Sequence, residues 1–397
     1  MRILIALSVF SIVALFGTPS WAEEVAPKGL KVACGSVGIE LKLCKEAVET
    51  WSKKAGYPAS IVSMPQAATE RLALYQQFLS AKQSSIDIFQ IDVIWPGILN
   101  SHLMDLKSYI PQDEIDRHFE SIIENNTIDG KLVAMPLYTD VGILYYRKDL
   151  LKKYGLRAPQ TWEELTATAR KIQEGERADG ISDFWGFVWQ GKREGLTCNA
   201  MEWVYSEGGG TIVGDDGKIT IINDEAIKAL SRAASWVGDI TPQGVLNYTE
   251  EESRGVFQSG KAAFMRNWPY AWSLSQSEDS PVKGKVGVSV LPRGSEKGDV
   301  HTGTLGGWQM AISKYSEQKE KAVELLRYLT GPEVQRQYAL QASYNPTIKS
   351  LYKEQAVLNA LPAADVLYEA LAHAVARPSR VTGFRYNQVS AGFSNTL

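Results

Sequence analysis

The sequence has few cysteines, few histidines and no excess of basic charge. It contains 3 Cys and 4 His in 397 residues, and 42 Lys and Arg against 45 Asp and Glu give a formal net charge of −3. The histidines stand singly, and no Cys or His spacing is typical of zinc, so neither a metal nor another cofactor is expected. A mildly acidic chain without basic runs also argues against nucleic acid or an anionic membrane as the main partner.

Long apolar runs are absent beyond the first residues of the chain. Residues 3–16 are almost wholly apolar, follow Arg2 and precede small residues ending at Ala22, which is typical of a secretory signal peptide. That run is too short to span a membrane, and no later segment has 18 uncharged apolar residues in a row. We therefore expect residues 1–22 to be removed and the remainder to be exported and soluble, in the periplasm if the source has two membranes.

Three cysteines in an exported protein leave two pairing states open. An oxidising compartment favours one bridge, and Cys34 and Cys44 are the nearer pair in the chain, at a strand end and inside the following helix. Cys198 would then be the odd one, buried and inert. The alternative is three unpaired thiols.

Strand and helix patterns alternate along the chain, which predicts an α/β fold. The segments 30–33, 59–63 and 86–91 have strand patterns, 40–54 has helical periodicity, and 69–81 is expected to be a helix opened by a capping residue. A chain of this length exceeds what one compact core usually holds, so two lobes are expected.

An aromatic stretch near the carboxyl-terminal third predicts one wall of a ligand site. Residues 265–272 read MRNWPYAW, three rings in five positions around Pro269, which disfavours an interior helical turn and lets the rings project sideways. Trp and Tyr offer flat apolar faces with a polar edge, which suits a pyranose sugar. The alternative interpretation is that these rings only fill a core.

Polar residues near strand ends are further candidates for ligand contacts. Asp92 follows a short apolar strand, at the edge where ligands gather in open α/β sheets, although it could instead be a helix cap or turn residue. Tyr138 and Asp140 are two positions apart, so on an extended backbone they point to the same side. Two glycines precede Trp308 and would let backbone approach a ligand closely.

Several motifs together resemble one family. They are GFVWQG at 186–191, NWPYAW at 267–272, SPVKGKVGV at 280–288, LGGW at 305–308 and LYYRKD at 144–149. In this order they resemble the trehalose/maltose-binding proteins, which belong to the extracellular solute-binding proteins, family 1, that serve ABC sugar importers. The resemblance runs from about residue 30 to residue 377.

The resemblance implies a two-lobed periplasmic-binding-protein fold with the ligand cleft between the lobes. The N-terminal lobe would comprise 23–137 and about 288–345, and the C-terminal lobe 138–287 and about 346–397, with hinge crossings near 137, 288 and 345. The family continues further after Arg377, so we expect some helical packing of the C-terminal lobe to be missing in a chain that ends at Leu397.

The resemblance also implies the residues that contact the sugar. Carboxylates and a guanidinium would bind hydroxyl groups, and aromatic rings would stack on the sugar faces. Carried over position by position, the set is Glu40, Thr69, Arg71, Asp92, Tyr138, Asp140, Trp268, Tyr270, Gly307, Trp308 and Arg377.

The function implied is that of the substrate-binding component of an ABC transporter. A monomer would capture a disaccharide, trehalose or maltose with sucrose as a further candidate, and deliver it to permease subunits in the inner membrane, without catalysis. One alternative is a sensory sugar-binding protein with no role in transport. Another is a glycoside hydrolase, in which Glu40, Asp92 and Asp140 would supply the paired carboxylates.

Overall fold

The protein is described from a computed structural model that covers residues 29–35, 38–65, 67–214, 216–361 and 364–397. The predicted signal peptide, residues 1–22, lies outside these ranges. For Thr69, one of the predicted contact residues, the backbone is described but the side chain is not.

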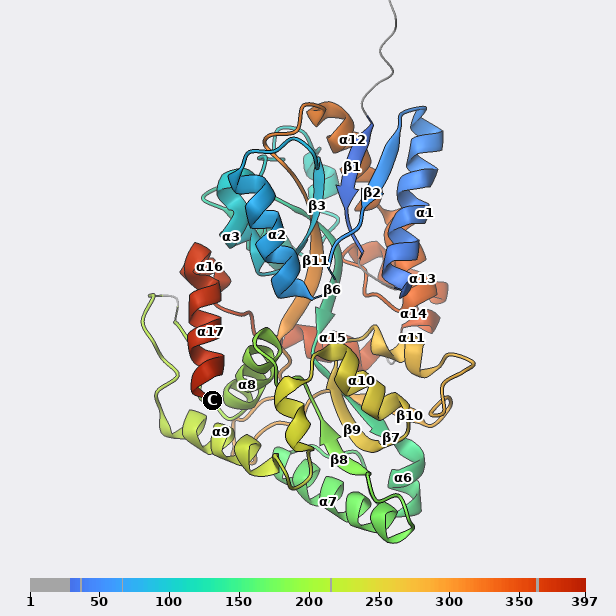
Figure 1. Ribbon diagram of the computed structural model, residues 1–397, viewed down its shortest axis with the longest axis vertical. Coiled ribbons are helices and arrows are strands. Elements are labelled where there is room, and N and C mark those ends of the chain that lie inside the picture. Colours follow the sequence, from blue (N-terminus) through green and yellow to red (C-terminus); the bar gives the residue numbers. More distant parts are fainter. Residues whose placement is uncertain (1–28, 36–37, 66, 215, 362–363) are drawn as a thin grey trace, which may run out of the picture.

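A five-stranded sheet forms the first lobe (Figure 1). Its order is β2 (Ala59–Val62), β1 (Leu30–Ala33), β3 (Ile88–Asp92), β11 (Leu305–Ile312) and β6 (Met135–Val141). Strands β1, β2 and β3 are parallel, whereas β11 runs antiparallel to both of its neighbours. Strand β11, late in the chain, is thereby inserted between two early strands.

A four-stranded sheet forms the second lobe. Its order is β10 (Val286–Ser289), β7 (Ile143–Arg147), β9 (Ala262–Asn267) and β8 (Trp185–Val188). Strand β7 is antiparallel to β10 and β9, and β8 is parallel to β9. A short hairpin of β4 (Thr127–Ile128) and β5 (Lys131–Leu132) lies outside both sheets.

Helices cover both sheets (Figure 1). In chain order they are α1 Gly38–Ala55, α2 Ala68–Ser80, α3 Trp95–Leu99, α4 Gln112–Ile115, α5 Glu120–Asn125, α6 Lys148–Lys153, α7 Trp162–Ala178, α8 Glu194–Ser206, α9 Asp224–Trp236, α10 Glu250–Gln258, α11 Ala271–Ser275, α12 Lys319–Leu329, α13 Pro332–Ala342, α14 Gln355–Ala360, α15 Ala364–Ala372, α16 Ser379–Thr382 and α17 Tyr386–Thr396. Short 3-10 turns are η1 Asn100–His102, η2 Gln243–Asn247, η3 Lys349–Lys353 and η4 Gly383–Arg385.

Local capping explains where some of these helices begin. Thr161 accepts a hydrogen bond from the amide of Glu164 and starts α7, and a capping box of Thr249 and Glu252 starts α10. Helix α2 corrects one expectation, because its N-cap is Ala67, which makes no side-chain cap, and Thr69 lies inside the helix. Apolar packing of the helix against the first lobe, through residues such as Leu72 and Tyr75, takes the place of a cap.

Between consecutive strands, the chain passes from the first sheet to the second after β6 and back to the first after β10. It leaves the first sheet at Gly142, between β6 and β7, and returns within 290–304, between β10 and β11. The predicted boundary near 137 falls inside β6, which stays in the first sheet up to Val141. At the carboxyl end, α16 contacts α3 of the first lobe and α17 contacts α8 of the second. The lobe boundaries themselves remain a prediction.

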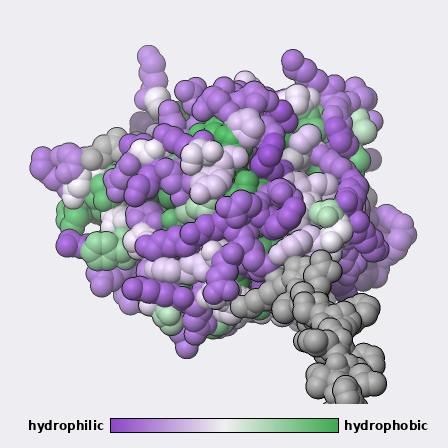
Figure 2. All heavy atoms as spheres, turned by 90° about the horizontal axis from the view of Figure 1, so that it is seen from above, coloured by the Kyte–Doolittle hydropathy of each residue, from purple (hydrophilic) through white to green (hydrophobic). Residues whose placement is uncertain are grey.

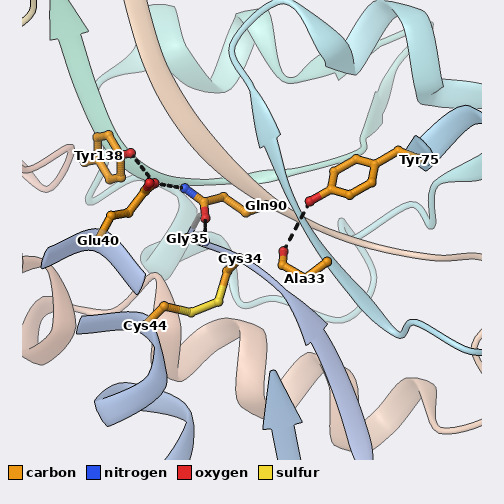
Figure 3. Close-up of a disulfide and its surroundings, with 8 residues drawn as sticks. All are labelled: Ala33, Cys34, Gly35, Glu40, Cys44, Tyr75, Gln90 and Tyr138. Atoms are coloured by element: carbon orange, nitrogen blue, oxygen red, sulfur yellow. Dashed lines mark hydrogen bonds between the residues drawn. A yellow bond between two sulfur atoms is a disulfide. The ribbon is translucent and has the colours of Figure 1, made fainter. Parts of the chain in front are cut away.

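Cys34 and Cys44 form a disulfide that ties the end of β1 to α1 (Figure 3). Their Cα atoms are 6.5 Å apart, within the usual range for a bridge. Cys198 is buried and unpaired, and burial raises the pKa of its thiol to about 12. A thiol in that state is protonated at neutral pH and poorly reactive.

This arrangement predicts the outcome of a thiol titration. The denatured, unreduced protein should present one reactive thiol, that of Cys198, and the folded protein should present none because that thiol is buried. After reduction the denatured chain should present three. Three thiols before reduction would contradict the bridge between Cys34 and Cys44.

The surface is mainly hydrophilic on the face shown in Figure 2, where hydrophobic residues form separate patches. Among the described residues, no helix combines the length and apolarity needed to cross a membrane. In the same part of the chain, no group of three or more His, Cys, Asp and Glu side chains could hold a metal ion.

Candidate ligand-binding site

Strand register in the first sheet brings three predicted contact residues together. Trp308 on β11 pairs with Asp92 at the carboxyl end of β3 on one side and with Tyr138 on β6 on the other. A register shift follows between Trp308 and Gln309. Residues separated by more than 200 positions therefore meet at one edge of the sheet.

Two glycines before Trp308 allow close packing at that edge. Gly307 has a φ of 125°, and a Cβ there would lie 2.7 Å from the carbonyl oxygen of Tyr138. A Cβ on Gly306 would lie 2.9 Å from the indole of Trp268. Any side chain at these positions would displace the neighbouring strand or the ring, so the Trp268 ring from the second lobe lies against β11 because Gly306 leaves room for it.

Glu40 links α1 to β3 and to β6, the last strand of the first sheet. Its Oε1 accepts a hydrogen bond from Gln90 Nε2 at 2.6 Å and from the Tyr138 hydroxyl at 2.7 Å (Figure 3). The Tyr138 ring stacks on Tyr344, with ring centroids 4.3 Å apart. The sequence analysis did not single out Gln90 or Tyr344, and neither stands in a motif that would have signalled it.

Asp140 is a buried carboxylate with an oxygen that lacks a hydrogen-bond partner. Its residue exposure is 6%, and Oδ1 has no partner among the described residues. Burial raises its pKa to about 7, and the neighbouring carboxylates of Glu40 and Asp92 act in the same direction. A hydroxyl donor placed against Oδ1 would satisfy this group.

Arg71 contributes a buried cation that is also incompletely paired. Its exposure is 1%, its Nε donates to the Pro65 carbonyl at 3.1 Å, and its Nη1 has no partner among the described residues. The guanidinium lies over the Trp308 ring, 4.5 Å from the centroid. It therefore offers a free donor beside a stacking surface.

Arg377 connects the two lobes through carboxylates. Its Nη2 donates to Asp92 Oδ1 at 3.4 Å, and its Nη1 donates to Glu194 Oε1 at 2.9 Å, while its buried Nε has no partner in the part of the chain that the structure describes. Burial raises the pKa of Asp92, and the charge of Arg377 opposes that shift. Glu194 also accepts from the hydroxyls of Tyr386 and Ser390, so it ties this cation to α17.

Two residues of the aromatic stretch, Trp268 and Tyr270, donate hydrogen bonds to glutamates that the sequence analysis did not single out. Trp268 Nε1 donates to Glu250 Oε1 at 3.3 Å, and the Tyr270 hydroxyl donates to Glu251 Oε1 at 2.6 Å. Both glutamates belong to the first turn of α10. In the sequence they follow Thr249 in a pattern typical of a helix start, and nothing in that pattern points to a ligand site.

Unsatisfied buried atoms distinguish this cluster from the rest of the described structure. Among charged side chains, buried atoms without a hydrogen-bond partner occur on Arg71, Asp140 and Arg377, and otherwise on Glu207 and Arg232, which form an ion pair with each other. Leaving such an atom unpaired costs roughly 1–3 kcal/mol or more. The three predicted contact residues are thus poised to exchange hydrogen bonds with a polar ligand.

A cavity of about 390 Å³ lies elsewhere, between α4, α12 and α13, and contains none of the predicted contact residues. Its charged lining side chains have ion-pair partners inside or outside the cavity, since Arg327 binds Glu114, Arg117 binds Asp113, Lys54 binds Glu333 and Lys321 binds Glu324. We assign the site to the cluster with unpaired charged atoms, not to this cavity.

Two α/β lobes, with charged groups and aromatic rings gathered where segments of both meet, define the fold and site of a solute-binding protein. Residues 45–336 match the profile of the bacterial extracellular solute-binding proteins, and the chain belongs to this family, as its motifs predicted. The predicted two-lobed α/β fold is likewise confirmed.

Similar proteins are found among curated sequences and solved structures. A Deinococcus radiodurans protein described as a probable ABC transporter-binding protein is 50% identical over 392 residues, covering 98% of this chain and 92% of its own. The maltose-bound MalE3 of T. maritima is 37% identical with a TM-score of 0.83, covering 93% of this chain and 99% of its own. A Thermotoga lettingae solute-binding protein bound with α-D-tagatose, 22% identical with a TM-score of 0.81 over 94% of both chains, shares the fold.

Proposed function

We propose that the protein is the substrate-binding component of an ABC sugar importer and captures a disaccharide, trehalose or maltose, between its lobes. The observation that carries the proposal is the set of unpaired buried atoms on Arg71, Asp140 and Arg377 beside the rings of Trp268 and Trp308. The 50% identity with a probable ABC transporter-binding protein and the 37% identity with a maltose-bound protein support it.

A neutral disaccharide fits the chemistry of these groups. It brings many hydroxyl groups and no charge, so carboxylates serve as strong acceptors and guanidinium groups as strong donors, each contributing roughly 1.5–3 kcal/mol. Stacking rings remove the apolar sugar faces from water. A micromolar dissociation constant requires about 8 kcal/mol in total, so a few such contacts are sufficient after the ordering cost.

The proposal also includes export of the protein and delivery of the sugar to a transporter. The mature chain would act as a monomer in the periplasm and present the sugar-bound form to permease subunits in the inner membrane, after hinge bending of the two lobes. The family and the fold are those of solute-binding proteins rather than enzymes, so incubation with trehalose or maltose should release no glucose.

A thermal-shift panel tests the proposed ligand class. Because a ligand that binds only the folded state stabilises it by about 2.7 kcal/mol at 100 times its dissociation constant, trehalose or maltose at millimolar concentration should raise the melting temperature by a few degrees. Sucrose tests the third candidate, and glucose, tagatose and mannitol serve as controls of smaller size. A panel in which the monosaccharide or polyol raises the melting temperature and no disaccharide does would contradict the proposal.

A further inference from the structure

A buried ion pair lies directly beneath the Trp268 ring. The side chains of Arg266 on β9 and Glu202 on α8 are 1% and 0% exposed. Arg266 Nε donates to Glu202 Oε2 at 2.9 Å, its Nη2 donates to Oε1, and its Nη1 donates to Gln190 Oε1 at 3.2 Å. Two desolvated charges held in this bidentate geometry have little freedom to move independently.

The Arg266 end of the pair supports the stacking ring. Its guanidinium carbon lies 4.0 Å from the centroid of the Trp268 ring. A planar cation under an indole fixes the height and tilt at which the ring can lie. A Cβ on Gly306 of β11 would lie 2.9 Å from Cζ3 of the same ring, so an edge of the Trp268 ring also lies against a strand of the first lobe.

The Glu202 end of the pair supports both central passages between the sheets. Its Oε1 accepts a hydrogen bond from the amide of Thr304 at 2.9 Å, directly before β11. At Gly142, the passage between β6 and β7, a Cβ would collide with Glu202 Oε1 and lie 2.6 Å from Arg266 Nη2. The Gly142 amide in turn donates to the Thr304 carbonyl at 3.2 Å. Both passages therefore lie against Glu202, and the passage at Gly142 also lies against Arg266.

Helix α8 presents these contacts from one face. Glu194, Cys198 and Glu202 are spaced four residues apart and so follow each other turn by turn. Glu194 binds Arg377, the Cys198 carbonyl accepts from the Thr304 hydroxyl at 2.8 Å, and Glu202 binds Arg266. One helix face thus contacts the passage into β11, the predicted contact residue Arg377, and Arg266, the cation beneath Trp268.

We propose that Glu202, acting through Arg266, is a positioning residue that couples the Trp268 ring to the hinge passages at Gly142 and Thr304. The inference rests on the proposed function, since it requires a sugar that binds between the lobes. A sugar stacked on Trp268 immobilises the ring and the cation beneath it, and the shared carboxylate transmits that constraint to both passages. Coupling of this kind is reciprocal, so the arrangement of the passages also sets the affinity for the sugar.

A purely structural role for the pair would have a different signature. Breaking a buried ion pair lowers stability wherever it lies, so the melting temperature alone does not separate the two roles. Glu207, at the end of the same helix, provides a matched control. Its side chain is 1% exposed and forms ion pairs with Arg232 and Lys228, and none of its recorded contacts involves Trp268, Gly142 or Thr304.

The experiment compares Glu202→Gln with Glu207→Gln in the full mature protein, using maltose and trehalose. The readouts are the melting temperature without sugar, the dissociation constant by calorimetry, and the radius of gyration by small-angle X-ray scattering at saturating sugar. Both variants should melt earlier than the parent. Only Glu202→Gln should bind the sugar at least tenfold more weakly and contract less than the parent at saturation.

A second variant keeps the test decisive if Glu202→Gln fails to fold. The double substitution Glu202→Leu with Arg266→Met removes both charges and retains apolar volume, an exchange that buried ion pairs often tolerate. It should show the same loss of affinity and of contraction. If either folded variant binds the sugar within twofold of the parent and contracts as the parent does, the inference is overturned and the proposed function is not. If the parent binds neither sugar, both the proposed function and the inference are contradicted.

Discussion

Replacing Trp268 by Ala is expected to weaken disaccharide binding by at least tenfold, about 1.4 kcal/mol, while the unliganded protein melts close to the parent temperature. The ring is only half-buried, and it contacts Arg266, Glu250 and Gly306 instead of the hydrophobic clusters of either lobe. A core tryptophan would behave differently, because truncation of a buried ring costs ~3–5 kcal/mol of stability. Calorimetry with maltose and trehalose, paired with thermal melting, measures both quantities.

Trp185→Ala is the matched control for that substitution. Trp185 is also half-buried, belongs to the same sheet and lies under a guanidinium, that of Arg177 at 4.6 Å, but none of its recorded contacts involves the proposed site. It should leave the affinity for sugar unchanged. Equal losses of affinity in both variants, or unfolding of Trp268→Ala, would show that Trp268 is a core residue and not a stacking surface.

Asp140→Asn should weaken disaccharide binding by at least tenfold and make the unliganded protein more stable at neutral pH. The amide keeps the shape of the side chain but is a weaker acceptor than a carboxylate. The amide also carries no charge that must be buried. Because burial raises the pKa of Asp140 from 3.8 to about 7, ionisation of this carboxyl group lowers the stability of the folded protein by at most about 4 kcal/mol, and the amide avoids that loss. Calorimetry and denaturant unfolding at pH 8 measure the two effects.

The pH dependence of the parent follows from the same carboxyl group. Because the folded state holds this proton more tightly than the unfolded state, the contribution of Asp140 to stability is most favourable below about pH 4, falls as pH rises to about 7 and is constant above. Sugar binding to the ionised form should run the other way and weaken roughly tenfold from pH 8 to pH 6. In Asp140→Asn both trends should flatten, and a variant that retains the parent's pH profile would assign the titration to another group.

Much of the architecture could be predicted because its signals are local. Alternating strand and helix patterns placed the elements of the first lobe. The glycines before Trp308 predicted a close approach of backbone to a ligand, and the structure shows a close approach of Gly307 to the backbone of Tyr138 on the neighbouring strand; the approach to a ligand stays a prediction. The insertion of β11 between β3 and β6 could not be predicted from periodicity, because it depends on pairing between distant segments. The cap expected at Thr69 was wrong because packing, not capping, fixes that helix.

The candidate site was predictable where a motif carried it. The rings and carboxylates stood in recognisable stretches, whereas Gln90, Glu194, Glu202 and Glu250 lie in ordinary helix and strand patterns and acquire their roles only through partners far away in the chain. Trp268 and Trp308, the two tryptophans of the predicted stacking surface, have different surroundings in the structure. Trp308 packs edge-on against Trp95, with ring centroids 5.5 Å apart, and borders the hydrophobic clusters of the first lobe, whereas Trp268 belongs to none of the hydrophobic clusters of the described residues. That either ring stacks on a sugar stays a prediction.

Isothermal titration of residues 23–397, the chain without the predicted signal peptide, with maltose and with trehalose tests the central claim most directly. We expect saturable binding of one disaccharide per chain with a micromolar dissociation constant for at least one of the two sugars, and its loss by tenfold or more in Asp140→Asn. The absence of saturable heat with both sugars, in protein that is folded by circular dichroism, would contradict the assignment of these residues to a disaccharide site.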